Sequence, residues 1–161
     1  MRSADWTPFA LGLGSNLATK ATLLSLGVSM LESTGDIHDL RVSAFERTDP
    51  VLPDGESTPH PPYLNAVAIG RTRLGPRALM SRLLAVETAL GRRRAVGCTP
   101  RTLDLDLLLF GDLRLDEVGI RIPHPRLKER SFVTRPLRTL LRQAGSEAAW
   151  RPFRSHLGDV D

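Results

Sequence analysis

Hydrophobic and polar positions alternate most clearly in the run RTLDLDLLLF, residues 101–110. The alternation predicts a β-strand in which the leucines at odd positions from Leu103 to Leu109 share one face and Asp104 and Asp106 share the other. Aspartate is depleted in strands, so two of them on one strand face need a reason. The strand continues into an apolar run that is expected to be buried on both faces, so the two carboxylates should lie at the mouth of a buried strand.

The rest of the chain shows strand and helix periodicities with turn signals between them. Strands are predicted at 9–14, 40–48 and 63–72, helices at 17–32 and 76–91, a hairpin at 112–122, and short helices at 126–132 and 134–143. Pro76 suits the first turn of the second helix and Gly91 its C-terminal cap. The proline-rich segment 49–62 and the basic segment 91–100 are predicted to be loops, and loops of that length are usually functional or disordered.

The order of these elements is β-α-β-β-α-β up to the acidic strand. It predicts an α+β fold with a ferredoxin-like core, in which an antiparallel sheet carries both helices on one face. The hairpin and the short helices follow this core, and Trp150 and Phe153 are expected to pack the last residues down. A chain of 161 residues fits a single domain, residues 1–161.

The basic residues of the chain favour one class of partner. Lysine and arginine together number 22 against 18 acidic residues, and all the basic residues except Lys20 and Lys128 are arginines. The planar arginine fork grips phosphate or carboxylate at two points. The net charge of +4 therefore favours an anionic partner, such as a nucleotide, a phosphate ester or a nucleic acid.

Cysteine use and hydropathy bear on the compartment. Cys98 is the single cysteine, so an internal disulfide is excluded and a reducing compartment is compatible. The chain contains no run of 18 apolar residues, so no transmembrane helix is predicted. Residues 1–8 are too polar for a signal peptide. We therefore expect a cytoplasmic location.

The acidic strand and the loop before it suggest phosphoryl chemistry. Two carboxylates about 7 Å apart on one strand face can hold one or two hard cations, and a pair of Mg²⁺ ions suits phosphoryl transfer. Arg92, Arg93, Arg94 and Arg101 come just before the strand, where their charge would stabilise a phosphoryl transition state. The alternatives left open are a solvated strand face and a charge run without a ligand.

The glycine-rich run GLGSNL, residues 12–17, follows the first predicted strand. Leu17 stands where a dinucleotide-binding fingerprint needs its third glycine, and no G-x-x-x-x-G-K-[ST] loop occurs in the chain. Both observations argue against a Rossmann or P-loop enzyme. A tight turn in which Ser15 or Asn16 caps the next helix is favoured instead.

A histidine and two aromatic residues give weaker signals. His124 lies between two prolines in a basic run, and it is either a surface histidine or a donor to phosphate. Tyr63 and Asn65 share one strand face, which could hold a flat heterocycle. Core packing is the alternative for Tyr63 and for Phe132.

Taken together, these segments resemble the 6-hydroxymethyl-7,8-dihydropterin pyrophosphokinases of folate biosynthesis. The resemblance extends from residue 11 to about residue 137, and its most specific parts are the PRTLDLD block and the PH-to-RSF block taken as a pair. The matching stretches are LGLGSN at 11–16, YLNA at 63–66, residues 87–94, TPRTLDLD at 99–106 and PHPRLKERSF at 123–132.

The resemblance implies transfer of an intact pyrophosphoryl group from ATP to the pterin hydroxymethyl oxygen, with release of AMP. It implies that Asp104 and Asp106 hold two Mg²⁺ ions. Arg92 and Arg101 would stabilise the charge that passes between the β-phosphorus and the leaving AMP. The residues implied in ATP binding are Glu87, Arg94, Arg101, His124 and Arg130.

For the pterin, the resemblance implies that Tyr63 and Phe132 sandwich the ring while Thr48 and Asn65 read its polar edge. The two long loops would close over the site and exclude water, which is a competing acceptor. The expected partners are ATP and the pterin, bound by a monomer that takes neither nucleic acid nor membrane.

The chain departs from the family pattern at a few positions. Glu46 stands where some members carry an aromatic residue, and Leu84 where some carry a glutamine that contacts nucleotide. Gly97 and Cys98 replace a pair that contains tryptophan. These departures leave the reaction type unchanged.

Two other functions are the alternatives. A ferredoxin-like RNA-binding module would expose stacking aromatics on its central strands, but only 5% of the residues are aromatic and acids occupy a strand face. A Mg²⁺-dependent phosphodiesterase would use the same aspartates without a pterin. Neither alternative explains the block 123–132.

Overall fold

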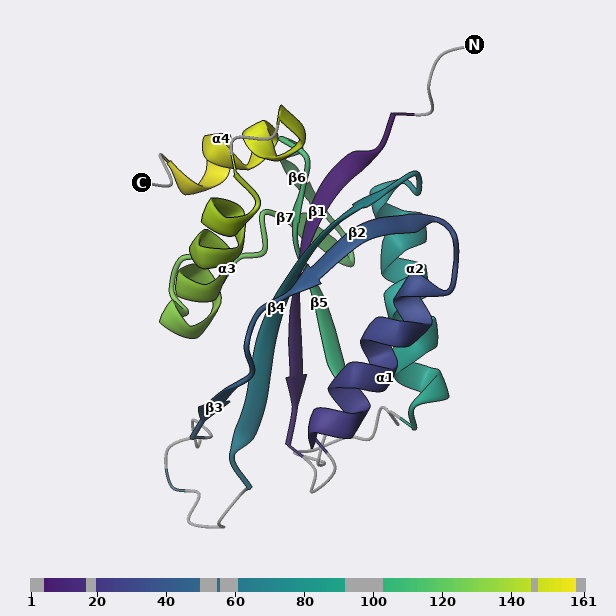
Figure 1. Ribbon diagram of the computed structural model, residues 1–161, viewed down its shortest axis with the longest axis vertical. Coiled ribbons are helices and arrows are strands. Elements are labelled where there is room, and N and C mark those ends of the chain that lie inside the picture. Colours follow the sequence, from purple (N-terminus) through teal and green to yellow (C-terminus); the bar gives the residue numbers. More distant parts are fainter. Residues whose placement is uncertain are drawn as a thin grey trace.

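The computed structural model describes residues 5–16, 20–49, 55, 61–91, 103–145 and 148–158. An antiparallel sheet runs through its centre (Figure 1). The strands are β1 (Thr7–Ser15), β2 (Ile37–Val42), β3 (Glu46–Thr48), β4 (Tyr63–Thr72) and β5 (Asp104–Phe110). They lie in the order β2-β4-β1-β5, and β3 pairs with β4 beyond the end of β2.

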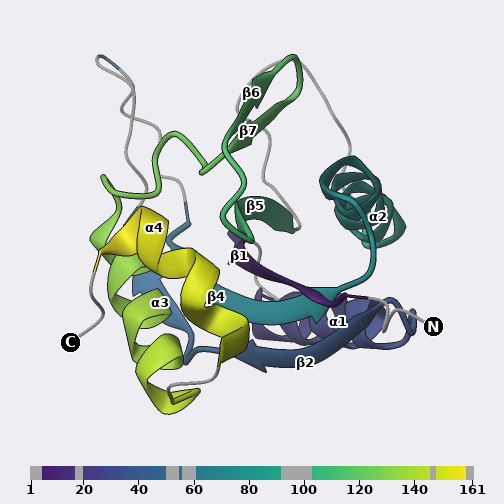
Figure 2. The same cartoon turned by 90° about the horizontal axis from the view of Figure 1, so that it is seen from above.

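The ferredoxin-like prediction is confirmed by this order. The helices α1 (Lys20–Glu32) and α2 (Pro76–Ala89) follow β1 and β4 and pack on one face of the sheet. The opposite face is covered by α3 (Ser131–Gln143), the 3-10 helix η1 (Ala148–Phe153) and α4 (Arg154–Leu157), as Figure 2 shows from above. The predicted hairpin consists of β6 (Leu115–Glu117) and β7 (Ile120–Ile122). No helix among the described residues is long and apolar enough to span a membrane.

Alternation along β1 separates the two layers of the core. Phe9, Leu11 and Leu13 are buried against α1 and α2, whereas Ala10 belongs to the core under α3. After Ala10, the next residues of β1 on the α3 side are Gly12 and Gly14. The α1 and α2 layer is therefore filled along the whole strand, while the α3 layer stops short of the end of β1.

The acidic strand differs from its predicted alternation at its far end. Ala10 pairs with Leu109 and Leu11 pairs with Leu107, so Leu108 is an extra residue in a β-bulge. Leu108 and Leu109 both pack on the α3 side, so the prediction that Leu109 shares a face with Leu103 is wrong. The physical reason is that a bulge advances one strand by a residue and reverses the alternation after it.

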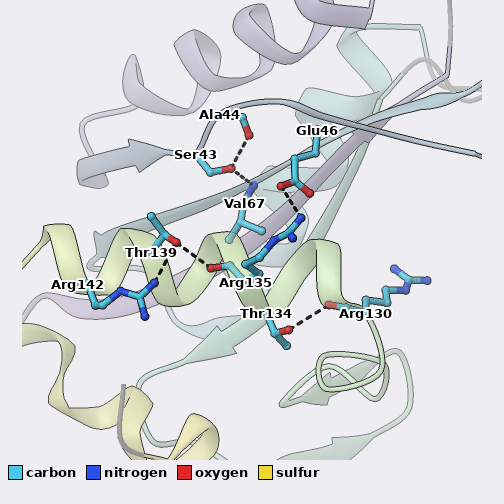
Figure 3. Close-up of polar contacts among 9 residues, drawn as sticks. All are labelled: Ser43, Ala44, Glu46, Val67, Arg130, Thr134, Arg135, Thr139 and Arg142. Atoms are coloured by element: carbon cyan, nitrogen blue, oxygen red, sulfur yellow. Dashed lines mark hydrogen bonds and ion pairs between the residues drawn. The ribbon is translucent and has the colours of Figure 1, made fainter. Parts of the chain in front are cut away.

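The predicted strand 40–48 is two strands. The backbone N–H of Ser43 donates to the carbonyl of Val67 (2.8 Å), but the N–H of Val67 donates back to the hydroxyl Oγ of Ser43 (3.0 Å). The same hydroxyl donates to the carbonyl of Ala44, 2.9 Å away (Figure 3). A side chain thus replaces a backbone group in the ladder, and the strand breaks before Glu46.

The predicted helix 126–132 is also wrong, because α3 begins only at Ser131. The residues before it form turns in which the N–H of Leu127 donates to the carbonyl of His124 (3.0 Å) and the N–H of Arg126 donates to the Nδ1 atom of His124 (3.2 Å). These short-range bonds replace the four-residue bonds of an α-helix. In α3 itself the buried residues recur at helical spacing: Val133, Leu137, Leu140 and Leu141.

The last described segment packs as expected, with Trp150 and Phe153 buried in the core under α3. The same segment buries His156, which is 3% exposed, and neither ring nitrogen has a hydrogen-bond partner within the described part of the chain. Burial lowers the pKa of His156 below 6.5, with Arg114 acting in the same direction and the nearby backbone of Gly111, followed by Asp112, acting against it. The fold therefore accommodates the neutral imidazole.

We expect the free energy of unfolding to fall as the pH drops below about 6.5, because the unfolded chain then binds a proton that the buried imidazole does not. The replacement His156→Leu should reduce this loss, as measured by urea unfolding at neutral and mildly acidic pH. His38→Leu, a change at an exposed histidine, is the matched control and should keep the wild-type slope. Equal slopes in wild type and His156→Leu would contradict the assignment.

Candidate active site

The candidate site lies where β1 ends and β4 and β5 begin. Gly14 pairs with Asn65 of β4 on one side and with Asp104 of β5 on the other. Asn65 also pairs with Glu46 of β3, so one row of residues crosses four strands on the α3 face of the sheet. Neighbouring strands are about 4.8 Å apart, which puts the Asn65 and Asp104 backbones about 10 Å from each other.

The glycines of β1 leave the floor of this row open. A Cβ atom added at Gly14 would lie 3.3 Å from the Oδ1 atom of Asn65, which is tighter than ordinary van der Waals contact. A Cβ atom added at Gly12, which pairs with Asp106, would lie 3.6 Å from the Leu108 side chain, an ordinary van der Waals contact. A molecule can therefore lie directly on the backbone between the amide on β4 and the two carboxylates on β5.

Three of the predicted pterin residues come together at one end of the floor. The Nδ2 group of Asn65 donates to the Oγ1 atom of Thr48 at 2.6 Å, and Thr48 pairs with Tyr63 across β3 and β4. All three side chains are half-buried. Phe132 is half-buried at the start of α3, where the Arg130 guanidinium lies 5.9 Å from its ring centre.

The other end of the floor combines carboxylate, imidazole and guanidinium. The N–H of His124 donates to the carbonyl of Leu108 (2.9 Å), which fixes the histidine beside β5. Burial lowers the pKa of His124; Asp106 opposes this shift, and Arg130 and Arg126 add to it. The Nδ1 atom accepts a hydrogen bond from the N–H of Arg126, so the neutral ring carries its proton on Nε2. His124 is therefore a neutral hydrogen-bond donor beside an acid.

A groove of about 1060 Å³ continues from this end along the outer edge of β5. Its lining residues come from α2, β5 and the β6–β7 hairpin, whose arrangement Figure 2 shows. Its walls are contributed by residues 105–107, by Arg77 and Met80 of α2, and by His124. Sequence reasoning missed Arg77 and Met80, because a basic and an apolar residue on a helix carry no signal of a groove. Only the tertiary arrangement brings them opposite the hairpin.

Glu87 lies behind β5 rather than among the residues that line this groove. Its side chain is 2% exposed, and its Oε1 atom accepts a hydrogen bond of 2.7 Å from the N–H of Leu105. Leu105 stands between the two aspartates on an edge strand, where its N–H would otherwise lack a strand partner. The buried carboxylate therefore holds the segment that carries Asp104 and Asp106.

Three of the predicted arginines, Arg92, Arg94 and Arg101, lie outside the described residues. Their predicted roles stay predictions. Most of the loop 49–62 also falls outside the described part of the chain.

Comparison with known proteins shows the family of the chain. Residues 10–142 match the family model of 7,8-dihydro-6-hydroxymethylpterin-pyrophosphokinase. The chain belongs to this family. It is 35% identical over 138 residues to the 2-amino-4-hydroxy-6-hydroxymethyldihydropteridine pyrophosphokinase of Bacillus subtilis, which covers 86% of this chain and 80% of that enzyme. The enzyme of the same name from Pseudomonas aeruginosa is 36% identical over 130 residues, 81% of this chain and 78% of its own length.

Other relatives are longer. The mitochondrial folate synthesis bifunctional protein of Arabidopsis thaliana is 36% identical over 153 residues, which is 93% of this chain. The chain spans only 27% of the length of that protein.

The described residues fit a magnesium ion bound together with a phosphate ligand. No group of three or more histidine, cysteine, aspartate or glutamate side chains suited to a metal occurs within the described ranges, so a closed site made by the protein alone is not present there. Mg²⁺ instead takes one or two carboxylates and completes its shell with water and substrate phosphates. Asp104 and Asp106 supply that pair of carboxylates on one strand face.

We expect Glu87→Ala to lower the free energy of unfolding by about 2–3 kcal/mol, because the buried N–H of Leu105 loses its charged acceptor. Glu87→Gln keeps a carbonyl oxygen at the same place and should lose about 1 kcal/mol or less. Urea unfolding of the two variants beside wild type measures both values. Equal losses would mean that the negative charge, and not the hydrogen bond to Leu105, is what the fold requires.

Proposed function

We propose that this protein transfers the pyrophosphoryl group of ATP to the hydroxymethyl oxygen of 6-hydroxymethyl-7,8-dihydropterin, giving AMP and the pterin diphosphate for folate synthesis. One observation carries the proposal. A carboxylate pair suited to a metal-bound triphosphate and an amide-hydroxyl-aromatic group suited to a flat heterocycle lie on the same backbone floor, with the Asn65 and Asp104 backbones about 10 Å apart.

In this proposal ATP lies along β5, with its adenosine in the groove between α2 and the β6–β7 hairpin. The triphosphate then reaches Asp106 and His124, which both line the inner end of the groove. The Nε2 proton of neutral His124 is available to a phosphate oxygen, and Arg130 lies close enough to influence the same imidazole. Arg94 and Arg101 are proposed to add further charge, and Glu87 to support the nucleotide side by holding β5.

The pterin is proposed to lie at the other end of the floor, between the rings of Tyr63 and Phe132. Its amide-like edge would face Asn65 and Thr48, whose mutual hydrogen bond already orients the Asn65 amide. This orientation points the hydroxymethyl group along the glycine floor toward Asp104. The reacting oxygen then lies between the two ends of the site.

The transfer forms a bond from the hydroxymethyl oxygen to the β-phosphorus and breaks the bond between the β-phosphorus and the oxygen bridging to the α-phosphate. The hydroxymethyl proton goes to solvent, and AMP leaves with the bridging oxygen. Asp104 and Asp106 would hold two Mg²⁺ ions, whose bound charge neutralises the phosphate oxygens. Arg92 and Arg101 are proposed to stabilise the charge that moves toward AMP.

The RNA-binding alternative is not favoured by the fold, because α3, η1 and α4 cover the sheet face that such a module would present to bases. No observation favours a phosphodiesterase, since that activity would leave the Thr48 and Asn65 pair without a role. That the enzyme acts as a cytoplasmic monomer stays a prediction.

The first test is a nucleotide assay with Mg²⁺, ATP and the hydroxymethyl dihydropterin. We expect AMP that depends on both the pterin and the metal, and a loss of at least about 100-fold in kcat for Asp104→Asn and Asp106→Asn, because each removes a carboxylate from the metal pair. Asp112→Asn, in the exposed turn after β5, is the matched control and should keep wild-type kcat. ADP as product, or AMP without pterin, would refute pyrophosphoryl transfer to the pterin.

Arg92→Ala tests the role in the transition state. We expect kcat to fall about 100-fold while the Kd of ATP rises less than about threefold, because the guanidinium acts on charge that develops during transfer. Arg92→Lys should recover only part of the loss, since lysine keeps the charge without the planar fork. A defect confined to ATP affinity would assign Arg92 to ground-state binding instead.

A further inference from the structure

The residues assigned to the proposed pterin position come in part from two walls, and one ion pair joins these walls. The first wall is β3, which carries Thr48, and the second is the start of α3, which carries Phe132. The guanidinium of Arg135 on α3 contacts the Oε1 atom of Glu46 on β3 at 3.1 Å (Figure 3). The contact links residues 89 positions apart in the chain.

On the strand side, the described residues hold β3 through its pairing with β4 and through the hydrogen bond from Asn65 to Thr48. β3 is three residues long and pairs only with β4 among the described strands. The break at Ser43, where a hydroxyl replaces a backbone acceptor, separates it from β2. Glu46 pairs with Asn65 and lies two residues before Thr48, so Glu46 and Thr48 project from the same side of β3. A displacement of Glu46 therefore also moves the Thr48 hydroxyl, which accepts the hydrogen bond from Asn65.

On the helix side, Arg135 lies one turn after Phe132, so both side chains leave α3 from neighbouring positions. The Arg130 guanidinium lies over the Phe132 ring at the helix N-terminus, and the carbonyl of Arg130 accepts from the hydroxyl of Thr134 at 3.4 Å (Figure 3). These contacts connect the first turn of α3 with the residue that precedes it. A tether at Arg135 fixes how far Phe132 lies from β3.

We infer that Glu46 and Arg135 are positioning residues that set the width of the slot for a planar bicyclic substrate. The inference rests on the proposed function, because the slot is the proposed pterin site. The Arg135 side chain is 72% exposed and that of Glu46 34%, so the pair contributes little to global stability. It shifts the equilibrium between docked and undocked β3, and exposed pairs of this kind change an equilibrium by about two- to fivefold.

The test is titration calorimetry of the hydroxymethyl dihydropterin into the protein loaded with Mg²⁺ and an α,β-methylene analogue of ATP. Glu46→Gln and Arg135→Gln should each raise the pterin Kd about two- to fivefold, with the Kd of the ATP analogue and the melting temperature unchanged. The exchanged variant, Glu46→Arg with Arg135→Glu, should restore the pterin Kd to within about twofold of wild type. The pterin is uncharged, so added salt should weaken its binding to wild type more than to Glu46→Gln.

Asp39→Asn is the matched control, because it removes a comparable exposed ion pair with Arg71 at the far end of β4 and should leave the pterin Kd unchanged. Asp39 has a φ of 52°, a conformation that asparagine also tolerates. Unchanged pterin binding in both single variants, or no recovery in the exchanged variant, would overturn the positioning role alone. Absence of pterin binding by wild type would overturn it together with the proposed function.

Discussion

β1 lies between β4 and β5 and has bulky side chains on one face and almost none at the end of the other. Phe9, Leu11 and Leu13 fill the layer under α1 and α2, whereas Gly12 and Gly14 leave bare backbone on the α3 side. The same alternation that anchors the central strand in the core thus also makes the floor of the site. A side chain at Gly14 would press on Asn65 and remove that floor.

The chemistry of the site comes from strands that are held from outside the sheet. Glu87 binds the outer edge of β5 between the two aspartates, and His124 is bonded to the carbonyl of Leu108 on the same strand. The β4 side is held in a different way, through the hydrogen bond between Asn65 and Thr48. A buried carboxylate thus fixes the strand that carries the aspartates, and a short, partly buried strand carries Thr48 at the other end. These ends are expected to differ in rigidity.

Much of the fold could be predicted from the hydrophobic periodicity of the sequence. The strand 63–72 was predicted with its observed bounds, because a proline-rich segment precedes it and a turn with Gly75 and Pro76 follows. The errors occur where a side chain or an extra residue alters the backbone pattern. The hydroxyl of Ser43 and the bulge at Leu108 leave no mark on hydrophobic alternation, so the sequence could not reveal them.

The candidate site was predictable in part. The acidic pair could be recognised in the sequence, since two aspartates on a strand face are unusual, and Asp106 lies close enough to His124 to influence its pKa. Arg77 of the groove wall and the contact between Glu46 and Arg135 depend on elements that meet only after folding. Residue type and spacing along the chain contain no information about such tertiary contacts.

The bulge at Leu108 divides β5 into two parts whose side chains alternate in opposite register. Before it, even-numbered positions face α3, and after it the odd-numbered Leu109 does. The half of β5 that carries the aspartates therefore faces the glycine floor, and the half that carries Leu108 and Leu109 faces the core beneath η1. Insertions or deletions beyond the bulge, in the hairpin that borders the groove, would leave both aspartates facing the floor. The hairpin side of the molecule is thus free to diversify while the two aspartates keep their orientation.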